Sequence, residues 1–282
     1  YPPPMLLLAA CATPDPTDTG PTFDADPPTE IGGDRPAAVV LPSDYSVDRS
    51  WPLVVLLHGY GATSDLQDVI FGFGDRIDSL GIILVKPEGT TDSRGAQFWN
   101  ATDECCDFDG SGVDDVAYLT GLLDEAETLY PIDSVRFTGH SNGGYMSYRM
   151  ACEIPDRIDR IGVLAGATWQ DEQDCVGTDP VSVLHVHGTE DTEVPYESNA
   201  GHAGAWESVE RWSTKAGCDE EAAELGTRDY LRGDGKAETT AYGFTGCAEG
   251  IDIELWSILG GDHVLLDNDT AFKDDFDAWV AG

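Results

Sequence analysis

The sequence predicts an α/β fold with a mostly parallel central sheet flanked by helices on both faces. Two observations support this prediction: short apolar runs of strand length recur along the chain, and segments with helical periodicity separate them. Several runs are apolar throughout, which is typical of strands that are buried on both faces. With 282 residues and 41% hydrophobic content, the chain can bury one sizeable core.

The predicted elements follow one another between residues 37 and 280. An edge strand is expected first, because Pro42 ends a short apolar run. Asp114 is expected at the start of a helix that ends near Leu129, with apolar residues on one face. The predicted strands are 37–41, 53–57, 82–85, a strand ending at 140, 161–165, 183–186 and 253–259, and the predicted helices are 114–129, 142–152, 205–216 and 270–280.

The stretch from Val135 to Gly144 contains a Gly-x-Ser-x-Gly pattern centred on Ser141. In a loop, this pattern would be a chance match. Here a strand rich in β-branched and aromatic residues precedes it and a helix follows, which is the context of a nucleophile elbow. Small residues on either side let strand and helix pack closely, and the helix N-terminus directs N–H groups to where an oxyanion would form. Ser141 is therefore the candidate nucleophile.

A serine nucleophile needs a histidine base and an acid that orients the histidine. In elbow enzymes the chain order is serine, acid, histidine. Asp191 lies in the loop after the predicted strand 183–186 and is the acid candidate, although two neighbouring glutamates compete with it. His263 follows the last strand in a glycine turn, whereas His202 heads a surface helix, so His263 is the predicted base. The earlier histidines are expected to serve packing or loop shape: His58, His140, His185 and His187.

The oxyanion hole of such an enzyme uses two backbone N–H groups. One belongs to the residue after the nucleophile, which is Asn142 here. The other comes from the loop after an early strand, where Tyr60 is the candidate. The ring of Tyr60 is also a candidate for lining the substrate cleft.

Several motifs recur together in this chain and carry a family resemblance. They are Leu56-Leu57-His58-Gly59, Trp99 followed by Cys105-Cys106, Val113-Asp114-Asp115-Val116, Gly139-His140-Ser141-Asn142-Gly143-Gly144, His187-Gly188 through Asp191 to Val194-Pro195-Tyr196, and Gly260-Gly261-Asp262-His263. Over about residues 34–280 the set resembles the polyhydroxybutyrate depolymerase and feruloyl-esterase-like group of exported α/β-hydrolases. The resemblance implies the α/β-hydrolase fold, a secreted serine esterase without a cofactor, and a triad of Ser141, Asp191 and His263.

The resemblance leaves the substrate open. The group often has Gly-Gly-Gly-His before an aromatic residue and proline, whereas this chain has Gly-Gly-Asp-His-Val-Leu-Leu, so the histidine side of the cleft is altered. We expect a polyester depolymerase that acts on polyhydroxyalkanoate or on an aromatic polyester such as PET. The alternative is a feruloyl or acetyl-xylan type esterase acting on plant polymers. A peptidase is possible in principle, and an alternative of another class is an inactive lipoprotein that uses the fold as a binding module.

Two tryptophans are candidates for substrate binding. Trp169 follows the strand 161–165 and, by resemblance, is a substrate-stacking residue, with a buried packing residue as the alternative. Trp99 is the weaker substrate candidate and fits a structural role better.

The cysteines and one acidic loop are the remaining candidate sites. An even number of cysteines in an exported chain predicts disulfides, and Cys218 with Cys247 is the expected local pair. Asp107 and Asp109 form a weak calcium candidate without the full EF-hand pattern; otherwise no metal site is expected. The disulfide candidates are Cys105, Cys106, Cys152, Cys175, Cys218 and Cys247.

The N-terminus reads as a targeting segment. Residues 1–11 resemble a signal sequence ending in a lipobox, so Cys11 is the candidate lipid anchor of a secreted or outer-surface lipoprotein. Residues 12–33 are expected to form a disordered acidic linker rich in Pro and Thr, and residues 34–282 a single catalytic domain.

The charge balance restricts partners and setting. With 53 acidic and 15 basic residues, the formal net charge is −38, which excludes nucleic acid as a partner. Salt screens such self-repulsion, so we expect a saline environment. We also expect the protein to be monomeric and of bacterial or archaeal origin. The alternative is an acidic secreted enzyme of no special habitat.

Overall fold

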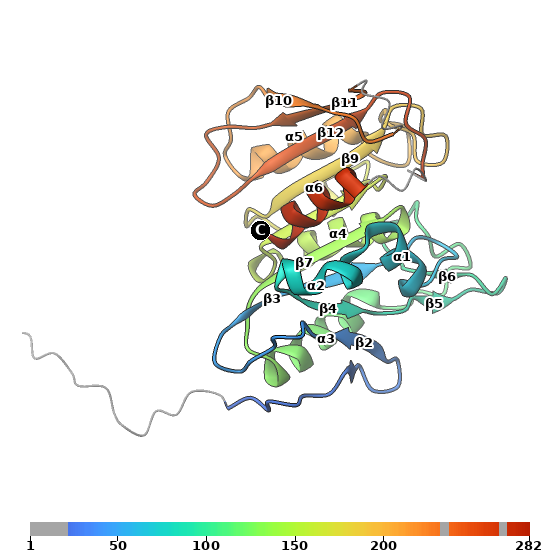
Figure 1. Cartoon of the computed structure of the whole chain (residues 1–282). Coiled ribbons are helices and arrows are strands. Elements are labelled where there is room, and N and C mark those ends of the chain that lie inside the picture. The colour runs from blue at the N-terminus through green and yellow to red at the C-terminus, as the bar shows by residue number, and fades with distance from the viewer. Residues whose placement is uncertain (1–21, 232–236, 265–269) are drawn as a thin grey trace, which may run out of the picture.

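The computed structural model of the chain describes residues 22–231, 237–264 and 270–282. These residues form a sheet of ten strands, with helices packed on both of its faces (Figure 1). The strand order is β1-β2-β4-β3-β7-β8-β9-β12-β11-β10. The strands from β4 to β12 in this order are parallel, and the pairs at both ends are antiparallel. The predicted fold class is confirmed.

Most element bounds lie within a few residues of those predicted from the sequence. The strands are β1 Glu30–Ile31, β2 Ala37–Val40, β3 Trp51–Leu57, β4 Ile83–Lys86, β5 Thr90–Thr91, β6 Gln97–Phe98, β7 Ile132–His140, β8 Arg160–Leu164, β9 Ser182–Gly188, β10 Ala223–Arg228, β11 Thr239–Gly243 and β12 Ile253–Ile258. The α-helices are α1 Ser64–Phe71, α2 Phe73–Leu80, α3 Asp115–Leu129, α4 Asn142–Glu153, α5 Ala205–Lys215 and α6 Thr270–Ala281.

The sheet separates two apolar cores. Alternate residues of β3 face opposite cores: Val55 belongs to the core that includes side chains of α3, α4 and α5, and Val54 to the core that includes those of α1, α2 and α6. Strands with both faces covered cannot alternate apolar and polar residues, which explains the continuous apolar runs in the sequence. The packing on both faces fixes the carboxyl ends of β3, β7, β9 and β12, and the loops that follow these strands carry the candidate site.

Two predictions near the N-terminus are wrong. β2 is not the edge strand, because β1 pairs with its outer side. The expected linker also ends earlier than residue 33: Ile31 is 2% exposed, and the carbonyl of Pro28 accepts a hydrogen bond from the Tyr130 hydroxyl at 2.5 Å. Tethering to α3 and the sheet therefore orders residues whose composition predicted disorder. Residues 1–21, which include Cys11, lie outside the described residues.

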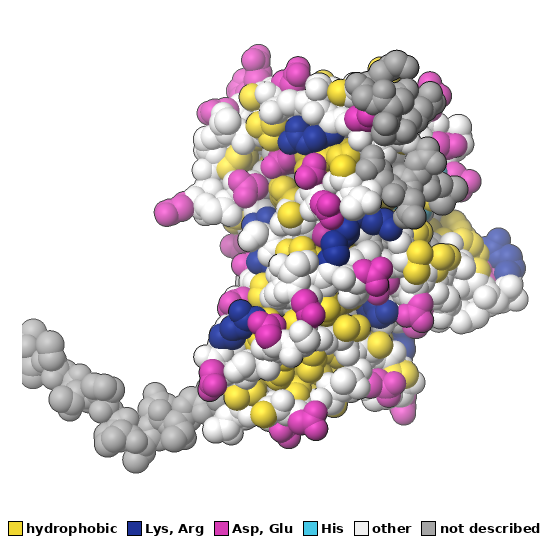
Figure 2. Space-filling view, viewed as in Figure 1, with side chains coloured by type: hydrophobic (Ala, Val, Ile, Leu, Met, Phe, Trp, Pro, Cys, Tyr) yellow, Lys and Arg dark blue, Asp and Glu magenta, His cyan; other side chains and the backbone are white. Residues whose placement is uncertain are grey.

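The surface of the molecule is strongly acidic. Figure 2 shows acidic side chains spread over the whole visible face, with fewer basic ones between them. None of the helices within the described ranges is long and apolar enough to cross a membrane.

Candidate active site

The turn between β7 and α4 holds Ser141 at a positive φ, with φ 54° and ψ −122°. A side chain rarely adopts this conformation unless its surroundings enforce it. Close packing does so here. A β-carbon on Gly143 would overlap the carbonyl of Leu57 in β3, and one on Gly139 would overlap the backbone of Gly143. The two glycines of the sequence pattern therefore allow β3, β7 and α4 to meet, and the half-buried Ser141 sits at their junction.

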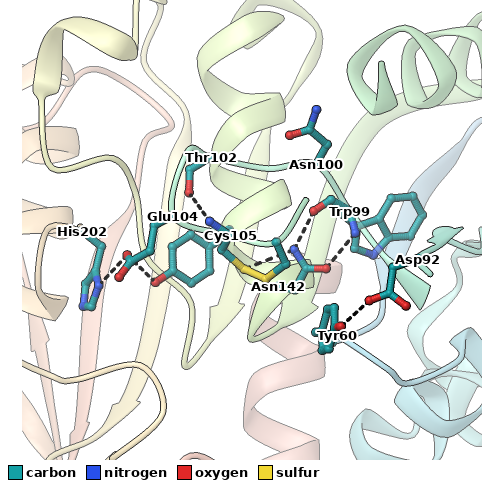
Figure 3. Close-up of a disulfide and its surroundings, with 12 residues drawn as sticks. Tyr60, Asp92, Trp99, Asn100, Thr102, Glu104, Cys105, Asn142 and His202 are labelled. Atoms are coloured by element: carbon teal, nitrogen blue, oxygen red, sulfur yellow. Dashed lines mark hydrogen bonds and ion pairs between the residues drawn. A yellow bond between two sulfur atoms is a disulfide. The ribbon is translucent and has the colours of Figure 1, made fainter. Parts of the chain in front are cut away.

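The side chain of Asn142 fixes the first turn of α4. Its Oδ1 accepts a hydrogen bond from the Trp99 N–H group at 2.8 Å, and its Nδ2 donates to the Trp99 carbonyl at 2.9 Å. Nδ2 also lies 3.4 Å from Sγ of Cys105, which forms a disulfide with the adjacent Cys106 (Figure 3). Because Asn142 is fully buried, this three-way contact ties the start of the helix to the loop that carries the disulfide.

The loop after β3 lies directly beside the serine. A β-carbon on Gly59 would be 3.5 Å from Cβ of Ser141, so the backbone at Gly59 and Tyr60 borders the same space as the start of α4. Within the described part of the chain, no hydrogen bond engages the N–H group of Tyr60 or that of Asn142. Two N–H groups with free hydrogen-bonding capacity beside a serine hydroxyl can stabilise an oxyanion.

The side chain of Tyr60 is held by Asp92 and Phe108. Its hydroxyl donates a 2.5 Å hydrogen bond to Asp92, which joins it to the connection between β5 and β6 (Figure 3). The Tyr60 hydrogen bond and the nearby backbone N–H groups lower the pKa of Asp92 to about 2. Phe108 packs edge-on against the Tyr60 ring, with centroids 5.3 Å apart.

The loops after β9 and β12 bring Asp191 and His263 together. Nδ1 of His263 donates to Oδ2 of Asp191 at 2.8 Å, and both residues are buried. The N–H groups of Glu193 and Val194 donate to Oδ1 of Asp191, each at 2.9 Å. Burial alone would raise the pKa of Asp191, but hydrogen bonds from His187, His263 and the Val194 N–H group hold it well below its usual range. Asp191 is therefore an ionised acceptor that fixes the tautomer of His263.

Sheet register explains why two loops far apart in sequence meet. β12 lies parallel to β9 and pairs Ile258 with Gly188, so the two strands end at the same level of the sheet. The N–H group of Glu190 then donates to the Gly261 carbonyl at 2.9 Å. A β-carbon on Gly188 would overlap Gly261, so the close approach of the two loops requires glycine there.

Ser141 and His263 lie at the same edge of the sheet. Nε2 of His140, the neighbour of Ser141, donates to the His263 carbonyl at 2.8 Å, and the two imidazole rings are 4.8 Å apart. Burial lowers the pKa of His140 to about 4, so it is a neutral donor. No hydrogen bond joins the Ser141 hydroxyl to the His263 imidazole in the described ranges. Such catalytic contacts often tighten only when substrate binds.

The other late histidine has a different partner. Nδ1 of His202 hydrogen-bonds Oε2 of Glu104 at 2.8 Å, and the residue is 1% exposed (Figure 3). His202 is therefore bound to the loop that carries Glu104 and Cys105. The histidine that pairs with Asp191 is His263.

The two candidate tryptophans are buried, whereas a side chain on which substrate stacks must be exposed. Trp99 is fully buried and its indole N–H donates to the His58 carbonyl at 3.0 Å, which agrees with the structural role that the sequence favoured over contact with substrate. Trp169 is 8% exposed, its backbone pairs with that of His202, and the Arg149 guanidinium lies over its ring. This burial supports the packing alternative for Trp169.

The acidic loop that suggested calcium is closed by hydrogen bonds. Asp107 accepts from the N–H groups of Ser111 and Gly112, and Asp109 accepts from that of Ser93. Among the residues that the structure describes, no group of three or more histidine, cysteine or acidic side chains could hold a metal ion. The calcium candidate gains no support from this geometry.

All six cysteines between residues 105 and 247 are paired. The expected pair Cys218–Cys247 is confirmed, and the others are Cys105–Cys106 and Cys152–Cys175. Three disulfides in one chain are typical of proteins that work outside the reducing cytoplasm.

Sequence reasoning missed two contributions to the site. The side chain of Asn142, considered only for its backbone, holds the start of α4. His187, assigned to packing or loop shape, has its Nε2 3.2 Å from Oδ2 of Asp191. The alternation of His185 and His187 along β9 was the available signal, because residues two apart in a strand share a face.

Known proteins agree with this architecture. The model of the family described as "Putative esterase" matches residues 29–224, which include Ser141 and Asp191. Feruloyl esterase D of Neurospora crassa is 27% identical over 88% of this chain and 80% of its own length. The bifunctional acetylxylan esterase/xylanase XynS20E of Neocallimastix patriciarum is 24% identical over 83% of this chain, which spans only 31% of that protein.

A solved structure shows the same fold. The acetyl xylan esterase from Aspergillus awamori superposes with a TM-score of 0.63 at 14% identity, over 86% of this chain and 97% of that one. The resemblance to feruloyl-esterase-like α/β-hydrolases that the motifs indicated is thereby confirmed. With the family match covering more than half of its residues, this chain belongs to the esterase family, a family of carboxylic ester hydrolases.

Proposed function

We propose that this chain is a serine esterase in which Ser141 is the nucleophile, His263 the base and Asp191 the acid. The observation that carries the proposal is the buried 2.8 Å hydrogen bond from His263 Nδ1 to Asp191, at the sheet edge where Ser141 occupies a tight turn with positive φ. With its Nδ1 proton held by an ionised carboxylate, His263 has Nε2 free to accept a proton.

The reaction proceeds through an acyl-enzyme. His263 takes the hydroxyl proton as Oγ of Ser141 attacks the ester carbonyl. The N–H groups of Asn142 and Tyr60 hold the resulting oxyanion, a contribution of about 3–4 kcal/mol per donor in enzymes of this type. His263 then protonates the leaving alcohol, and water activated by the same imidazole releases the acid.

For the substrate we propose feruloyl or acetyl esters attached to plant polymers. The names of the relatives, feruloyl esterase D and a bifunctional acetylxylan esterase/xylanase, support this alternative over the polyester depolymerase that the sequence suggested first. The half-buried Tyr60 ring, held by Asp92 beside the elbow, offers a surface on which an aromatic acyl group could pack.

The test compares wild type with Ser141→Ala on methyl ferulate, acetylated xylan, p-nitrophenyl butyrate, amorphous polyhydroxybutyrate and a PET film. We expect wild type to cleave methyl ferulate or acetylated xylan faster than either polyester and Ser141→Ala to be inactive on every ester. Faster release from either polyester would overturn the substrate proposal but leave the triad intact. If wild type cleaves no ester and does not react with a fluorophosphonate probe, the binding-module alternative replaces the esterase.

We also propose an exported, saline setting for a single catalytic domain that is monomeric and anchored through Cys11. The three disulfides support export, and the net charge of −38 supports the saline setting. The Debye length falls from about 10 Å at 0.1 M salt to about 3 Å at 1 M, so repulsion among surface carboxylates fades over that range. Thermal unfolding measured at both salt concentrations tests the setting: greater thermal stability at 1 M sodium chloride is expected, and equal stability would contradict it.

A further inference from the structure

A chain of three buried side chains ends at the candidate acid. The Tyr148 hydroxyl lies 2.7 Å from Nδ1 of His185, whose Nε2 lies 2.9 Å from Nδ1 of His187. Nε2 of His187 then lies 2.8 Å from the Val194 carbonyl and 3.2 Å from Oδ2 of Asp191. Tyr148 and His185 are 0% exposed and His187 is 1% exposed, so water does not satisfy these groups.

A carbonyl at one end sets the direction of every proton in this chain. The Val194 carbonyl can only accept, so Nε2 of His187 must carry the proton. With both imidazoles neutral, Nδ1 of His187 then accepts from Nε2 of His185, and Nδ1 of His185 accepts from the Tyr148 hydroxyl. Each donor in the chain therefore meets an acceptor. Burial supports the neutral state, since it lowers the pKa of His185 and raises that of Tyr148.

We propose that Tyr148, His185 and His187 position Asp191 and link it to the helix that carries Ser141. This inference rests on the proposed function, in which Asp191 is the acid of the triad. His187 is the positioning residue, because it alone of the three contacts Asp191.

Two contacts of His187 explain how it acts. Nε2 of His187 lies 3.2 Å from Oδ2 of Asp191, the oxygen that accepts the hydrogen bond from His263, so the imidazole packs against the carboxylate and restricts rotation of the Asp191 side chain. The Nε2–H group itself donates to the Val194 carbonyl, while the Val194 N–H group donates to Oδ1 of Asp191. His187 thus braces both the carboxylate and the turn that presents it.

The other end of the chain belongs to the nucleophile helix. Tyr148 lies in α4, about two turns after Ser141. Movement of α4 relative to β9 would break the hydrogen bond between Tyr148 and His185. The chain is therefore a second link between nucleophile and acid, which passes beneath the site and does not involve His263. Apolar side chains could fill the same space without the cost of burying two imidazoles, which favours a positioning role over packing.

The test compares two amide substitutions at one position. The longer side chain of His187→Gln places an amide N–H group close to the position of Nε2. The shorter side chain of His187→Asn ends near the position of Nδ1 and leaves the position of Nε2 without a donor. We expect His187→Asn to lower kcat by about tenfold to a hundredfold, as for other residues that orient a functional side chain, with KM unchanged. His187→Gln should keep kcat within about threefold of the wild-type value, a much smaller loss than in His187→Asn. Equal losses in both variants, or a raised KM with unchanged kcat, would overturn the proposal.

A second measurement does not depend on activity. In protein labelled with 15N-histidine, NMR should show His185 and His187 as neutral Nε2–H tautomers, and Tyr148→Phe should perturb the His185 signals. A protonated Nδ1 on either ring would overturn the chain as described. An inactive wild type would refute the proposed function, and with it the positioning of a triad, whereas active wild type with an unaffected His187→Asn variant would refute the positioning role alone.

Discussion

The contact between Asn142 and Trp99 supports a quantitative prediction. Asn142→Ala removes both hydrogen bonds to the Trp99 backbone and the contact with Cys105. The Trp99 carbonyl keeps the N–H group of Cys106 as a donor at 3.2 Å, so it stays satisfied. The buried Trp99 N–H group loses the partner that the structure gives it.

The magnitude follows from this accounting. A buried donor without a partner costs about 1–3 kcal/mol, and the second hydrogen bond adds about 1 kcal/mol. We therefore expect Asn142→Ala to lower the free energy of unfolding by about 2–4 kcal/mol. Because the start of α4 is then less firmly held, kcat should fall about tenfold, less than the 10²–10³ lost when an oxyanion donor is removed outright.

The assay is urea denaturation with steady-state kinetics on a soluble ester. Ser147→Ala is the matched control, because its buried hydroxyl donates to the Gly143 carbonyl at 2.8 Å within the same helix. That carbonyl also lies at the position that accepts the regular helical hydrogen bond from residue 147, so the control should cost less than about 1 kcal/mol. If Asn142→Ala is as stable and as active as Ser147→Ala, the hydrogen bonds between Asn142 and the Trp99 backbone do not contribute to stability, and the reasoning fails.

The remaining predictions concern the acid, the elbow and pH. Asp191→Asn should lower kcat by about 10⁴ without unfolding the protein, because an amide facing His263 favours the wrong tautomer; a loss below tenfold in single-turnover kinetics would contradict this. Gly143→Ala should destabilise by about 1–3 kcal/mol in urea, since its β-carbon meets a β3 carbonyl, whereas Gly121→Ala, in open space on α3, should not destabilise. Burial raises the pKa of Asp277 from 3.8 to about 7 despite its contact with an arginine. The folded state therefore binds the proton more tightly, and stability should fall by up to about 1.4 kcal/mol per pH unit between about pH 4 and 7. Asp277→Asn should abolish this contribution in denaturation curves measured across that range, and an unchanged slope would refute it.

Features of the site that depend on local sequence could be predicted. The elbow pattern names Ser141 because a strand, a tight turn and a helix are all local. The order of serine, acid and histidine then selects residues that follow strand ends, and parallel strands bring their carboxyl ends to one edge of the sheet. His263 could be chosen over His202 on that basis.

Features that depend on how loops pack, or on a choice among many possible pairings, could not be predicted. The pairing of Cys105 with Cys106 is one of many that six cysteines permit. The burial of Trp99 depends on how its loop packs under α4, and the contact between His187 and Asp191 depends on the turn after β9. β10 has a largely exposed burial pattern, so hydrophobic periodicity gives little signal for it. The short helices α1 and α2 lie between strong signals and were missed.

The disulfide between Cys218 and Cys247 has a consequence for how the chain tolerates cleavage. It joins the segment after α5 to the segment before β12, so β10 and β11 lie within a covalently closed loop. A protease that cut this loop once would produce two fragments, one with Ser141 and Asp191 and the other with His263. The disulfide would keep both fragments in one molecule, and β9 and β12 would still pair directly. The outer strands can thus be nicked, or can vary in sequence, without separating the nucleophile from its base.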